Sequence, residues 1–445
     1  MSFCSNDSSR DVVVTGLGMV TPLGLTSADT WRHLLSGGRG CRELSPSDID
    51  CFEKLQGVSG LRIYGAPVVA KETAHRLETI DWPHCVSSEV RRAWLGEPLI
   101  AFSLLSLTEA MQHAGLCRQK LARSSVSVVF GSSKGGLRTA ESLVRPTRDD
   151  ERGWLARFSN AFTTDGPTRA VAAIVSAGLG IRCPVAACAT GLVSLLQGAS
   201  LISSGECDVC ITGSADAALR ASVMSSFHRL RVTSRHELAE TACRPFDRNR
   251  DGFVIGEGAA TIILESRSHA TARGAEILAR VVSGGWLNHP TGMTQIDDTG
   301  TIVRELLTRS VPRDVCPDIV NLHGTGTETN DLAEARGVHS VFGLVPRSFG
   351  VKGAMGHLLG AAGSVETAIT IMALRDRIIP GTTNLSTPDP ECRLNLSPVT
   401  QSISSLTTAL KLSLGFGGHV ACGLFERESA SLERSETYSR SVAGS

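Results

Sequence analysis

The feature that most restricts the fold of this 445-residue chain is an internal repeat. Apolar strand patterns, glycine-rich turns and small-residue helix patterns follow one another in the same order in each half. The matched pairs are residues 11–18 with 277–284, 125–130 with 318–323, the segment around Cys188 with 348–351 and 357–374, 208–212 with 408–414, and 259–264 with 419–425. Two copies of one α/β unit bury their apolar faces by packing together. We therefore expect α/β halves at residues 1–265 and 266–426, related by a pseudo-twofold with helices sandwiched between their sheets, and a flexible polar tail at 427–445.

Composition narrows the function classes. Hydrophobic residues make up 42% of the chain, enough for a large core, and 44 basic residues balance 44 acidic ones. A balanced charge gives no general case for binding nucleic acid or a membrane surface. The amino terminus lacks the apolar core of a signal peptide, and no apolar run approaches the ~18 residues of a membrane span. Thirteen cysteines in a chain too large to need disulfides fit a reducing compartment, so we expect a soluble cytoplasmic protein.

Cys188 lies in the segment PVAACATGLVSLL. Residues 184–187 form a short apolar run that predicts a buried strand, and residues 189–203 have a small-residue helix pattern. Unpaired N–H groups and the positive end of the helix dipole at such a junction favour a thiolate, the reactive form of a nucleophilic cysteine. The alternative is that Cys188 is a small buried apolar residue, the usual state of a free cysteine.

His323 and His357 are the candidate partners of this thiol. His323 ends a strand pattern at HGTGT, and His357 opens a helix pattern in KGAMGHLLGAAG. Both are repeat counterparts of first-half strand ends or helix starts, so a pseudo-twofold could bring all three side chains into one pocket between the halves. A thiolate beside two imidazole donors can hold an acyl thioester and stabilise an adjacent enolate oxygen. The alternative for each histidine is a satisfied core residue or a surface residue.

Two other motifs are weaker. Gly16-x-Gly18 begins a dinucleotide-loop pattern, but Thr21 stands at the third glycine position and a turn follows, so nucleotide binding is disfavoured. Cys207 and Cys210 have a Cys-x-x-Cys spacing that could suggest zinc or redox chemistry. No second ligand pair lies at a suitable spacing, so a pair of core cysteines is favoured and no metal site is predicted.

Six segments, taken together and in order, resemble the elongating β-ketoacyl-[acyl-carrier-protein] synthases of the thiolase-like fold. They are VTGLGMVTPLG, AACATG, RPFDRNRDGFVIGEGA, HGTGTETNDLAE, VKGAMGHLLGAAG and LGFGG. The resemblance covers about residues 11–426. It implies duplicated α/β halves in a five-layered αβαβα sandwich, and decarboxylative condensation of an acyl-enzyme thioester with malonyl-[acyl-carrier-protein] in fatty-acid or polyketide elongation. It also implies an acyl carrier protein as partner, a homodimer, and no cofactor beyond the phosphopantetheine that the carrier holds.

The resemblance assigns roles to five polar residues. Cys188 takes the acyl chain, and His323 and His357 promote decarboxylation and stabilise the enolate. Lys352 is the motif lysine, and Glu334 is the motif acid that we expect to pair with it. The alternative is that these two residues form an ordinary buried ion pair with no role in catalysis.

The resemblance also implies an oxyanion hole made by the backbone N–H groups of Cys188 and Phe416, with Phe416 gating the acyl pocket. The glycines beside Phe416 leave its ring room to move. The positions that match contacts to the pantetheine arm of the carrier are Thr294 in Met293-Thr294, Thr325 and Thr327.

Four residues depart from the family pattern. Leu412 and Val420 replace two asparagines, so the local hydrogen bonding must differ, and His289 stands where an aspartate is common. Lys134 occupies a position usually small or apolar near the floor of the acyl pocket. We expect its ammonium to shorten or polarise that pocket and to favour short or oxygenated acyl chains, because a desolvated charge beside an alkyl tail costs several kcal/mol.

Three alternative functions follow from the same motifs. A thiolase shares the fold but generally uses a second, carboxyl-terminal cysteine, and Cys422 lies within a strand pattern rather than in the expected loop. A non-catalytic subunit of the chain-length-factor type would lack Cys188. A ketosynthase of a specialised polyketide or unusual lipid pathway would share the motifs, so the sequence does not separate it from an enzyme of primary fatty-acid synthesis.

Overall fold

The computed structural model describes residues 1–3, 8–49, 52–68, 70–122, 124–143, 155, 157–289 and 298–428. The main strands of the first half are β1 (Val12–Val20), β4 (Val126–Gly131), β5 (Ile181–Arg182), β6 (Val209–Asp216) and β7 (Gly258–Ser266). Those of the second half are β8 (Ala279–Asn288), β9 (Ile319–Asn321), β10 (Arg347–Phe349), β14 (Thr408–Gly415) and β15 (His419–Glu426). Their order is β1-β7-β6-β4-β5 in the first half and β8-β15-β14-β9-β10 in the second, with β12 (Asn395–Leu396) at the outer edge.

The two halves repeat one pairing pattern. In the first, β4 is parallel to β5 and β6, while β7 is antiparallel to β6 and β1. In the second, β9 is parallel to β10 and β14, while β15 is antiparallel to β14 and β8. Four of the five predicted correspondences are therefore confirmed, namely β1 with β8, β4 with β9, β6 with β14 and β7 with β15. The two sheets are not separate, however, because β1 and β8 pair from Val12 with Val281 to Val14 with Ala279 and join them into one sheet of 11 described strands.

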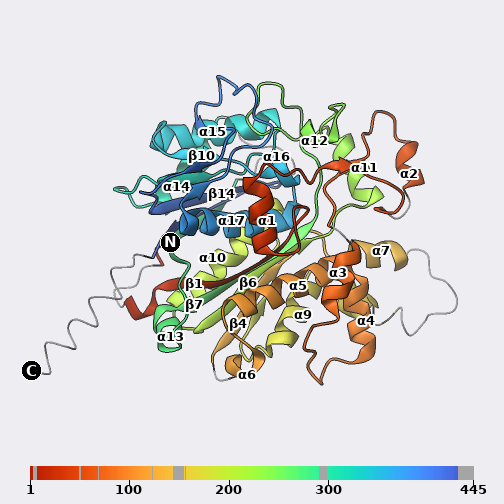
Figure 1. Ribbon diagram of the computed structural model, residues 1–445, viewed down its shortest axis with the longest axis vertical. Coiled ribbons are helices and arrows are strands. Elements are labelled where there is room, and N and C mark those ends of the chain that lie inside the picture. The colour runs from red at the N-terminus through yellow and green to blue at the C-terminus, as the bar shows by residue number, and fades with distance from the viewer. Residues whose placement is uncertain are drawn as a thin grey trace, which may run out of the picture.

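Helices complete five layers (Figure 1). In the middle layer, α10 (Thr190–Ser203) and α17 (Ala362–Asp376) lie against each other and contact strands of both halves. The first-half sheet is covered on its outer side by α5 (Pro98–His113) and α9 (Gly166–Val175). The second-half sheet is covered by α14 (Thr301–Ser310) and α15 (Glu328–Phe342). This arrangement buries both apolar faces of each sheet, and it confirms the predicted αβαβα sandwich.

The two middle helices meet at their amino-terminal ends through glycine. A Cβ atom added to Gly191 in α10 would lie 2.2 Å from the backbone nitrogen of Ser364 in α17. One added to Gly363 would lie 2.6 Å from the backbone of α10. No other residue type permits this approach. The contact brings together the turns that precede the two helices, and these turns carry Cys188 and His357.

Gly16 and Gly18 lie inside β1 rather than in a nucleotide-binding loop. A Cβ atom at Gly18 would lie 2.0 Å from the carbonyl oxygen of Ser106, and one at Gly16 would lie 2.4 Å from that of Ala110, both in α5. The two glycines therefore let α5 pack directly on the strand.

The strand predicted at 184–187 is wrong. β5 ends at Arg182, residues 183–186 have no regular structure, and Cys188 lies in the 3-10 turn η3 (Ala187–Ala189) that leads into α10. Pro184 has no N–H for a sheet ladder. The Ala186 N–H is used locally, since it donates to Thr190 Oγ1 at 2.9 Å.

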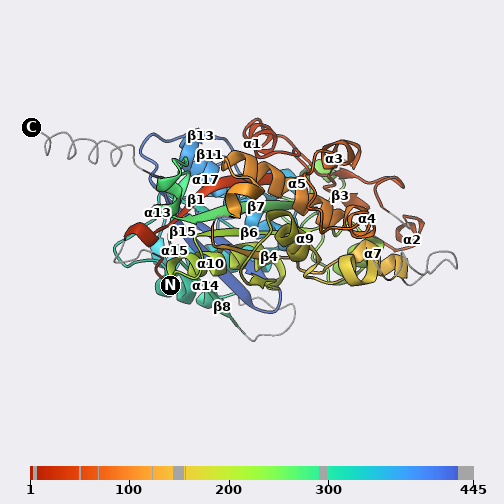
Figure 2. The same ribbon diagram turned by 90° about the horizontal axis from the view of Figure 1, so that it is seen from below.

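The remaining elements are short, and α2, α3, α4 and α7 lie at the end of the molecule away from the amino terminus (Figures 1 and 2). The helices are η1 (Ser8–Arg10), α1 (Ser27–Leu35), α2 (Glu53–Gln56), α3 (Ala70–Leu77), α4 (Ser88–Gly96), α6 (Arg118–Leu121), α7 (Leu137–Leu143), η2 (Phe158–Phe162), α11 (Ala221–Arg229), α12 (Ala239–Ala242), α13 (Arg267–Ala272), α16 (Lys352–Met355) and η4 (Leu359–Ala361). The strands are β2 (Arg42–Glu43), β3 (Tyr64–Gly65), β11 (Ile378–Ile379) and β13 (Gln401–Ser402).

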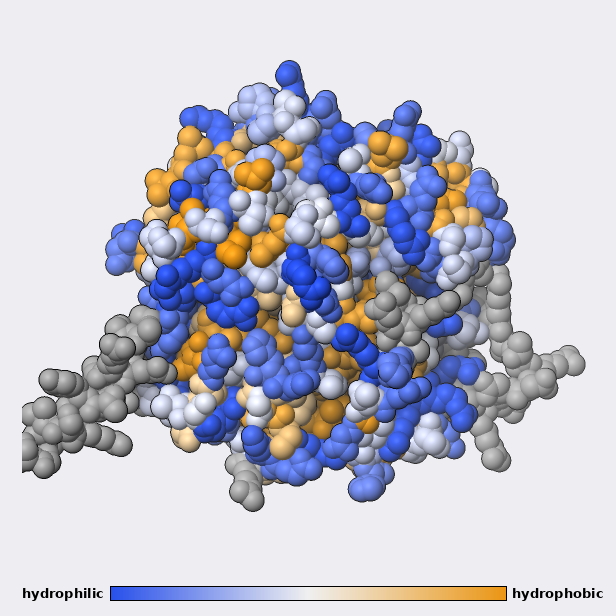
Figure 3. Space-filling view, in the orientation of Figure 1, coloured by the Kyte–Doolittle hydropathy of each residue, from blue (hydrophilic) through white to orange (hydrophobic). Residues whose placement is uncertain are grey.

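The predicted boundary between residues 265 and 266 falls near the end of β7 and stays a prediction. The flexible tail was predicted at residues 427–445, and residues from 429 onward lie outside the described ranges. Within those ranges, no helix combines the length and apolar character needed to cross a bilayer. On the face shown in Figure 3, hydrophilic side chains are interspersed with hydrophobic ones.

Candidate active site

Cys188 projects from a tight turn at the start of α10. Ala187 has a positive φ of 47°, a conformation that costs free energy for a residue with a side chain. Thr190 stabilises the turn, since its hydroxyl donates to the Ala187 carbonyl at 2.7 Å. The second half has the same turn, in which Leu359 (φ 52°) opens η4 just before α17. The repeat therefore places Cys188 and the residues around His357 in equivalent turns.

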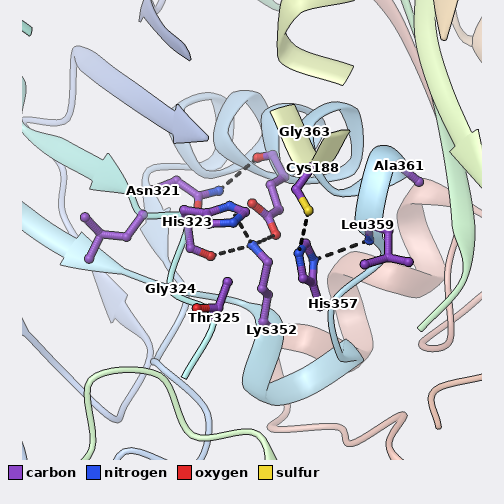
Figure 4. Close-up of polar contacts among 12 residues, drawn as sticks. Cys188, Asn321, His323, Gly324, Thr325, Lys352, His357, Leu359, Ala361 and Gly363 are labelled. Atoms are coloured by element: carbon purple, nitrogen blue, oxygen red, sulfur yellow. Dashed lines mark hydrogen bonds and ion pairs between the residues drawn. The ribbon is translucent and has the colours of Figure 1, made fainter. Parts of the chain in front are cut away.

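His357 contacts the thiol directly, as Figure 4 shows. Its Nε2 lies 3.1 Å from Cys188 Sγ, and its Nδ1 lies 3.3 Å from the Leu359 backbone nitrogen. A backbone N–H only donates, so Nδ1 accepts and the neutral ring carries its proton on Nε2. The ring of Phe253 packs edge-on against the imidazole, with 5.1 Å between the centroids. His357 thus presents an N–H donor to the sulfur and to the space beside it.

His323 lies in the loop after β9, with its ring centroid 5.3 Å from that of His357. The Lys352 ammonium donates to the His323 carbonyl, and its Nζ lies 3.3 Å from His323 Nδ1. An ammonium has no acceptor, so this ring also carries its proton on Nε2. The structure therefore brings Cys188 and both predicted histidines together, with each imidazole held as a hydrogen-bond donor.

The predicted pairing of Lys352 with Glu334 is wrong. Lys352 Nζ lies 2.5 Å from Oε1 of Glu366 on α17, and the other carboxylate oxygen of Glu366 lies 2.6 Å from Nζ of Lys411. Glu334 lies on α15 and accepts hydrogen bonds from the backbone N–H groups of His323 and of Gly324, the latter at 2.8 Å. Glu334 therefore shapes the loop that carries His323, whereas Glu366 holds the lysine.

Sequence reasoning missed Glu366 and Lys411. Lys411 Nζ also donates to backbone carbonyls of residues 321, 322 and 412, so it ties β14 to the end of β9. A signal for both was present, because each is a single charged residue within a run of apolar and small uncharged residues. A buried charge of this kind requires a partner.

Burial dominates the titration of the site. It lowers the pKa of His323 and of His357 well below 6.5, and the positive charge of Lys352 lowers both further. Both imidazoles are therefore neutral donors near pH 7. Burial raises the pKa of the Cys188 thiol to about 11, against the opposing effect of Lys134 and Lys352. The thiolate expected from the helix dipole is thus outweighed in the resting site by desolvation. Burial also raises the pKa of Glu334 to about 7.

The three side chains open into a cavity of about 500 Å³. Its lining residues are Cys188, Phe227, Leu230, Arg231, Val232, Arg250, Asp251, Phe253, His323, Thr325, Thr327, Glu328, Thr329, Asn330, His357, Leu414, Gly415 and Phe416. Thr325 and Thr327 are among them, with their hydroxyl oxygens 2.8 Å apart. Met293 and Thr294 lie outside the described residues.

Phe416 lines the cavity from the turn between β14 and β15. A Cβ atom at the preceding Gly415 would lie 2.9 Å from the Ala186 carbonyl oxygen and 3.1 Å from the Cys188 backbone nitrogen, so glycine lets this turn approach the thiol loop closely. The Phe416 ring lies 6.1 Å from that of Phe227, centroid to centroid. The oxyanion hole and the gate assigned to this turn stay predictions.

The departures from the family pattern have different surroundings. Leu412 and Val420 are buried in an apolar cluster, so packing replaces the side-chain hydrogen bonds of asparagines. The His289 N–H donates to the Gly418 carbonyl at 3.0 Å. Lys134 does not line the Cys188 cavity but a neighbouring one.

Cys422, Cys207 and Cys210 do not line the Cys188 cavity. Cys422 is fully buried in β15 and does not line the cavity, so a second thiol of the thiolase type is not placed here. Cys207 and Cys210 are also buried. Within the described ranges, no group of three or more His, Cys, Asp or Glu side chains is arranged to hold a metal ion.

The chain matches two family models, "Beta-ketoacyl synthase, N-terminal domain" over residues 9–270 and "Beta-ketoacyl synthase, C-terminal domain" over residues 290–386. It is 33% identical to 3-oxoacyl-[acyl-carrier-protein] synthase 2 of Mycobacterium tuberculosis over 430 residues, which cover 94% of this chain and 97% of that protein. It is 30% identical to the Staphylococcus aureus enzyme of the same name over 432 residues, 94% of this chain and 99% of that protein.

Two solved structures extend this similarity. One is a type II polyketide ketosynthase in complex with its acyl carrier protein, with a TM-score of 0.81 and 25% identity. The other is a β-ketoacyl synthase from Burkholderia phymatum, with a TM-score of 0.81 and 26% identity. Each comparison covers 94% of this chain and 100% of the other. Together with the cysteine and two histidines in one cavity, these matches confirm the resemblance and the acyltransferase class, and the chain belongs to the β-ketoacyl synthase family.

Proposed function

We propose that this chain elongates acyl chains by decarboxylative condensation of an acyl group on Cys188 with malonyl-[acyl-carrier-protein], which yields 3-oxoacyl-[acyl-carrier-protein]. One observation carries the proposal. The Cys188 sulfur lies 3.1 Å from His357 Nε2 in a cavity that His323 also lines, so one nucleophile faces two neutral N–H donors. A thioester spanning this space would meet both.

The first step transfers an acyl group to the enzyme. The Cys188 sulfur forms a bond to the acyl carbonyl carbon, and the bond from that carbon to the carrier sulfur breaks. His357 Nε2 already carries a proton, so it donates to sulfur and does not serve as the base there. The thiol proton leaves with the departing carrier thiol.

The second step forms the carbon–carbon bond. Malonyl-carrier places its thioester oxygen against the Nε2–H groups of His323 and His357, which stabilise the enolate as carbon dioxide departs. The electron pair of the broken carbon–carboxylate bond then forms the bond to the acyl-Cys188 carbonyl, whose oxyanion is met by the N–H groups of Cys188 and Phe416. The carbon–sulfur bond breaks, and the thiolate regains a proton. Carboxylate loss supplies the nucleophile, so we propose that no metal or redox cofactor takes part.

We further propose an acyl carrier protein as the partner, with Thr325 and Thr327, and Thr294 beside Met293, holding its pantetheine arm. Support comes from the two threonines that line the cavity and from the similar ketosynthase solved with its acyl carrier protein. The edge strand β5 supports a homodimer, because it exposes the apolar Ile181 and the segment that follows it exposes Val185. A cytoplasmic location is supported by the eleven described cysteines, each of which is free.

A ketosynthase of a specialised polyketide or unusual lipid pathway is the second candidate. Lys134 favours it, since a charged side chain beside an acyl cavity suits a functionalised chain better than a plain alkyl chain. A thiolase is disfavoured by the burial of Cys422, and a non-catalytic subunit by the presence of Cys188 in the cavity.

Reconstitution tests the proposed function. Purified chain, acyl-carrier protein and malonyl-carrier protein should yield 3-oxoacyl-carrier protein and carbon dioxide, measured by intact-protein mass spectrometry. Cys188→Ala should abolish condensation and could retain malonyl decarboxylation, while Cys85→Ser, which changes an exposed cysteine, should retain both activities. Near-native elongation by Cys188→Ala would refute the assignment.

A further inference from the structure

A second cavity of about 310 Å³ adjoins the Cys188 cavity. Its lining residues are Lys134, Ser222, Val223, Ser226, Phe227 and Leu230, most of them on α11. Phe227 and Leu230 line both cavities, so they form the wall between them. The centroid of the Phe227 ring lies 6.1 Å from that of Phe416 and 5.6 Å from Lys134 Nζ. A chain attached to Cys188 that follows this wall therefore leads to Lys134.

Lys134 has no direct ion pair with a described carboxylate. Its Nζ donates to Ser133 Oγ at 2.8 Å, and no carboxylate of the described residues lies within ion-pair distance. Ser133 Oγ in turn donates to Asp216, which also accepts from Ser132 Oγ at 2.8 Å and from the Gly360 N–H at 2.6 Å. This carboxylate therefore reaches Lys134 only through the intervening Ser133 hydroxyl. Two of the three N–H bonds of the ammonium are therefore available to a ligand.

The hydroxyl groups of this cavity are already committed. Ser226 Oγ donates to the Ser222 carbonyl at 2.7 Å, and Ser222 Oγ donates to Glu141 Oε1 at 3.0 Å. Glu141 in turn pairs with Arg220. Lys134 thus has unused donors and no direct ion pair, and Val223, Phe227 and Leu230 give the rest of the cavity an apolar surface.

We propose that Lys134 determines the specificity of the subsite that the acyl chain on Cys188 reaches past Phe227, and that it selects chains bearing a carbonyl or carboxylate oxygen over plain alkyl chains. This inference rests on the proposed function. An oxygen acceptor would complete the hydrogen bonding of a half-buried ammonium, whereas an alkyl chain would desolvate it without compensation. Apolar contacts along the shared wall would hold the methylene groups between thioester and oxygen.

The test compares acylation of Cys188 by carrier proteins loaded with three ten-carbon chains: plain decanoyl, one with a terminal carboxylate and one with a distal ketone. Intact-mass kinetics give kcat/KM for transfer to Cys188 in the absence of malonyl-carrier. The unmodified chain should prefer the oxygenated acyl groups. Lys134→Met should lower their kcat/KM at least tenfold relative to decanoyl, and Lys134→Arg should restore most of the preference. Lys120→Met, which removes an exposed lysine, should leave all three ratios unchanged.

Three results would overturn the subsite. They are preference of the unmodified chain for decanoyl, equal loss with all three chains in Lys134→Met, and failure of all three chains to acylate Cys188. Acylation without 3-oxo products on addition of malonyl-carrier would refute the proposed function alone, because the acylation ratios would still decide the role of Lys134. If Lys134→Met lowers kcat/KM for the carboxylate chain but not for the ketone chain, the selected feature is the negative charge of the chain.

Discussion

Glu366→Gln is the most informative single change in the network behind the site. Glu366 is the carboxylate that lies 2.5 Å from Lys352 Nζ and 2.6 Å from Lys411 Nζ, and the side chains of both lysines are fully buried. Glutamine has nearly the same shape but no charge. The variant therefore leaves two buried ammonium groups facing a neutral amide.

The size of the effect follows from charge and burial. Removing one partner of a buried ion pair costs about 3–5 kcal/mol. Two cations share this carboxylate, so we expect the upper end, about 5 kcal/mol, which is a large fraction of the ~5–15 kcal/mol that stabilises a typical protein. Lys411→Met should cost less, because Glu366 then keeps Lys352 as its partner. The double variant removes one of the stranded cations, so it should be more stable than Glu366→Gln alone.

Urea unfolding followed by circular dichroism would measure these free energies for the native chain, the two single variants and the double variant. The decisive quantity is the coupling between the two positions. A loss below ~1 kcal/mol in Glu366→Gln would contradict the reasoning, since a buried partner is worth more than that. A double variant whose loss equals the sum of the single losses would also contradict it, because the two side chains would then act independently.

Three further predictions concern the thiol, the histidines and the helix contact. Burial raises the pKa of Cys188 to about 11, so its alkylation by iodoacetamide should rise about tenfold per pH unit from pH 7 to 10; a plateau reached below pH 8 would contradict this. Burial lowers the pKa of His323 and of His357 well below 6.5, and an imidazole stays neutral at every pH above its pKa. The rate of malonyl decarboxylation should therefore not fall between pH 7 and pH 6. A loss of rate with a midpoint near pH 6.5 would mean that one of the two histidines titrates normally. Gly191→Ala places a methyl group 2.2 Å from the Ser364 backbone nitrogen, so it should lower the free energy of unfolding by about 1–3 kcal/mol, measured by thermal unfolding. Gly57→Ala is the control, because its methyl group would meet no atom within 4 Å and the stability should stay unchanged.

The repeat and the local patterns determined much of this protein. Four of the five matched strand pairs, such as residues 125–130 with 318–323, occupy equivalent places in the two halves of the sheet. The pseudo-twofold then brought Cys188, His323 and His357 to one cavity. This could be predicted because the alternation of apolar segments and glycine turns is a local property, and duplication fixes how two such units can bury their faces.

Tertiary structure alone decided the partners of the buried charges. The family pattern pointed from Lys352 to Glu334, but Glu366 on the neighbouring middle helix lies closer and is shared with Lys411, a residue on a third element. In the same way, burial raised the pKa of the Cys188 thiol against the effect of the helix dipole. Phe227 of α11 lies in the wall between the two cavities, so Lys134 lines the second cavity and not the one with the thiol. Strand and helix periods are encoded within a few residues, whereas ion pairing and desolvation depend on which side chains distant segments bring within a few ångströms.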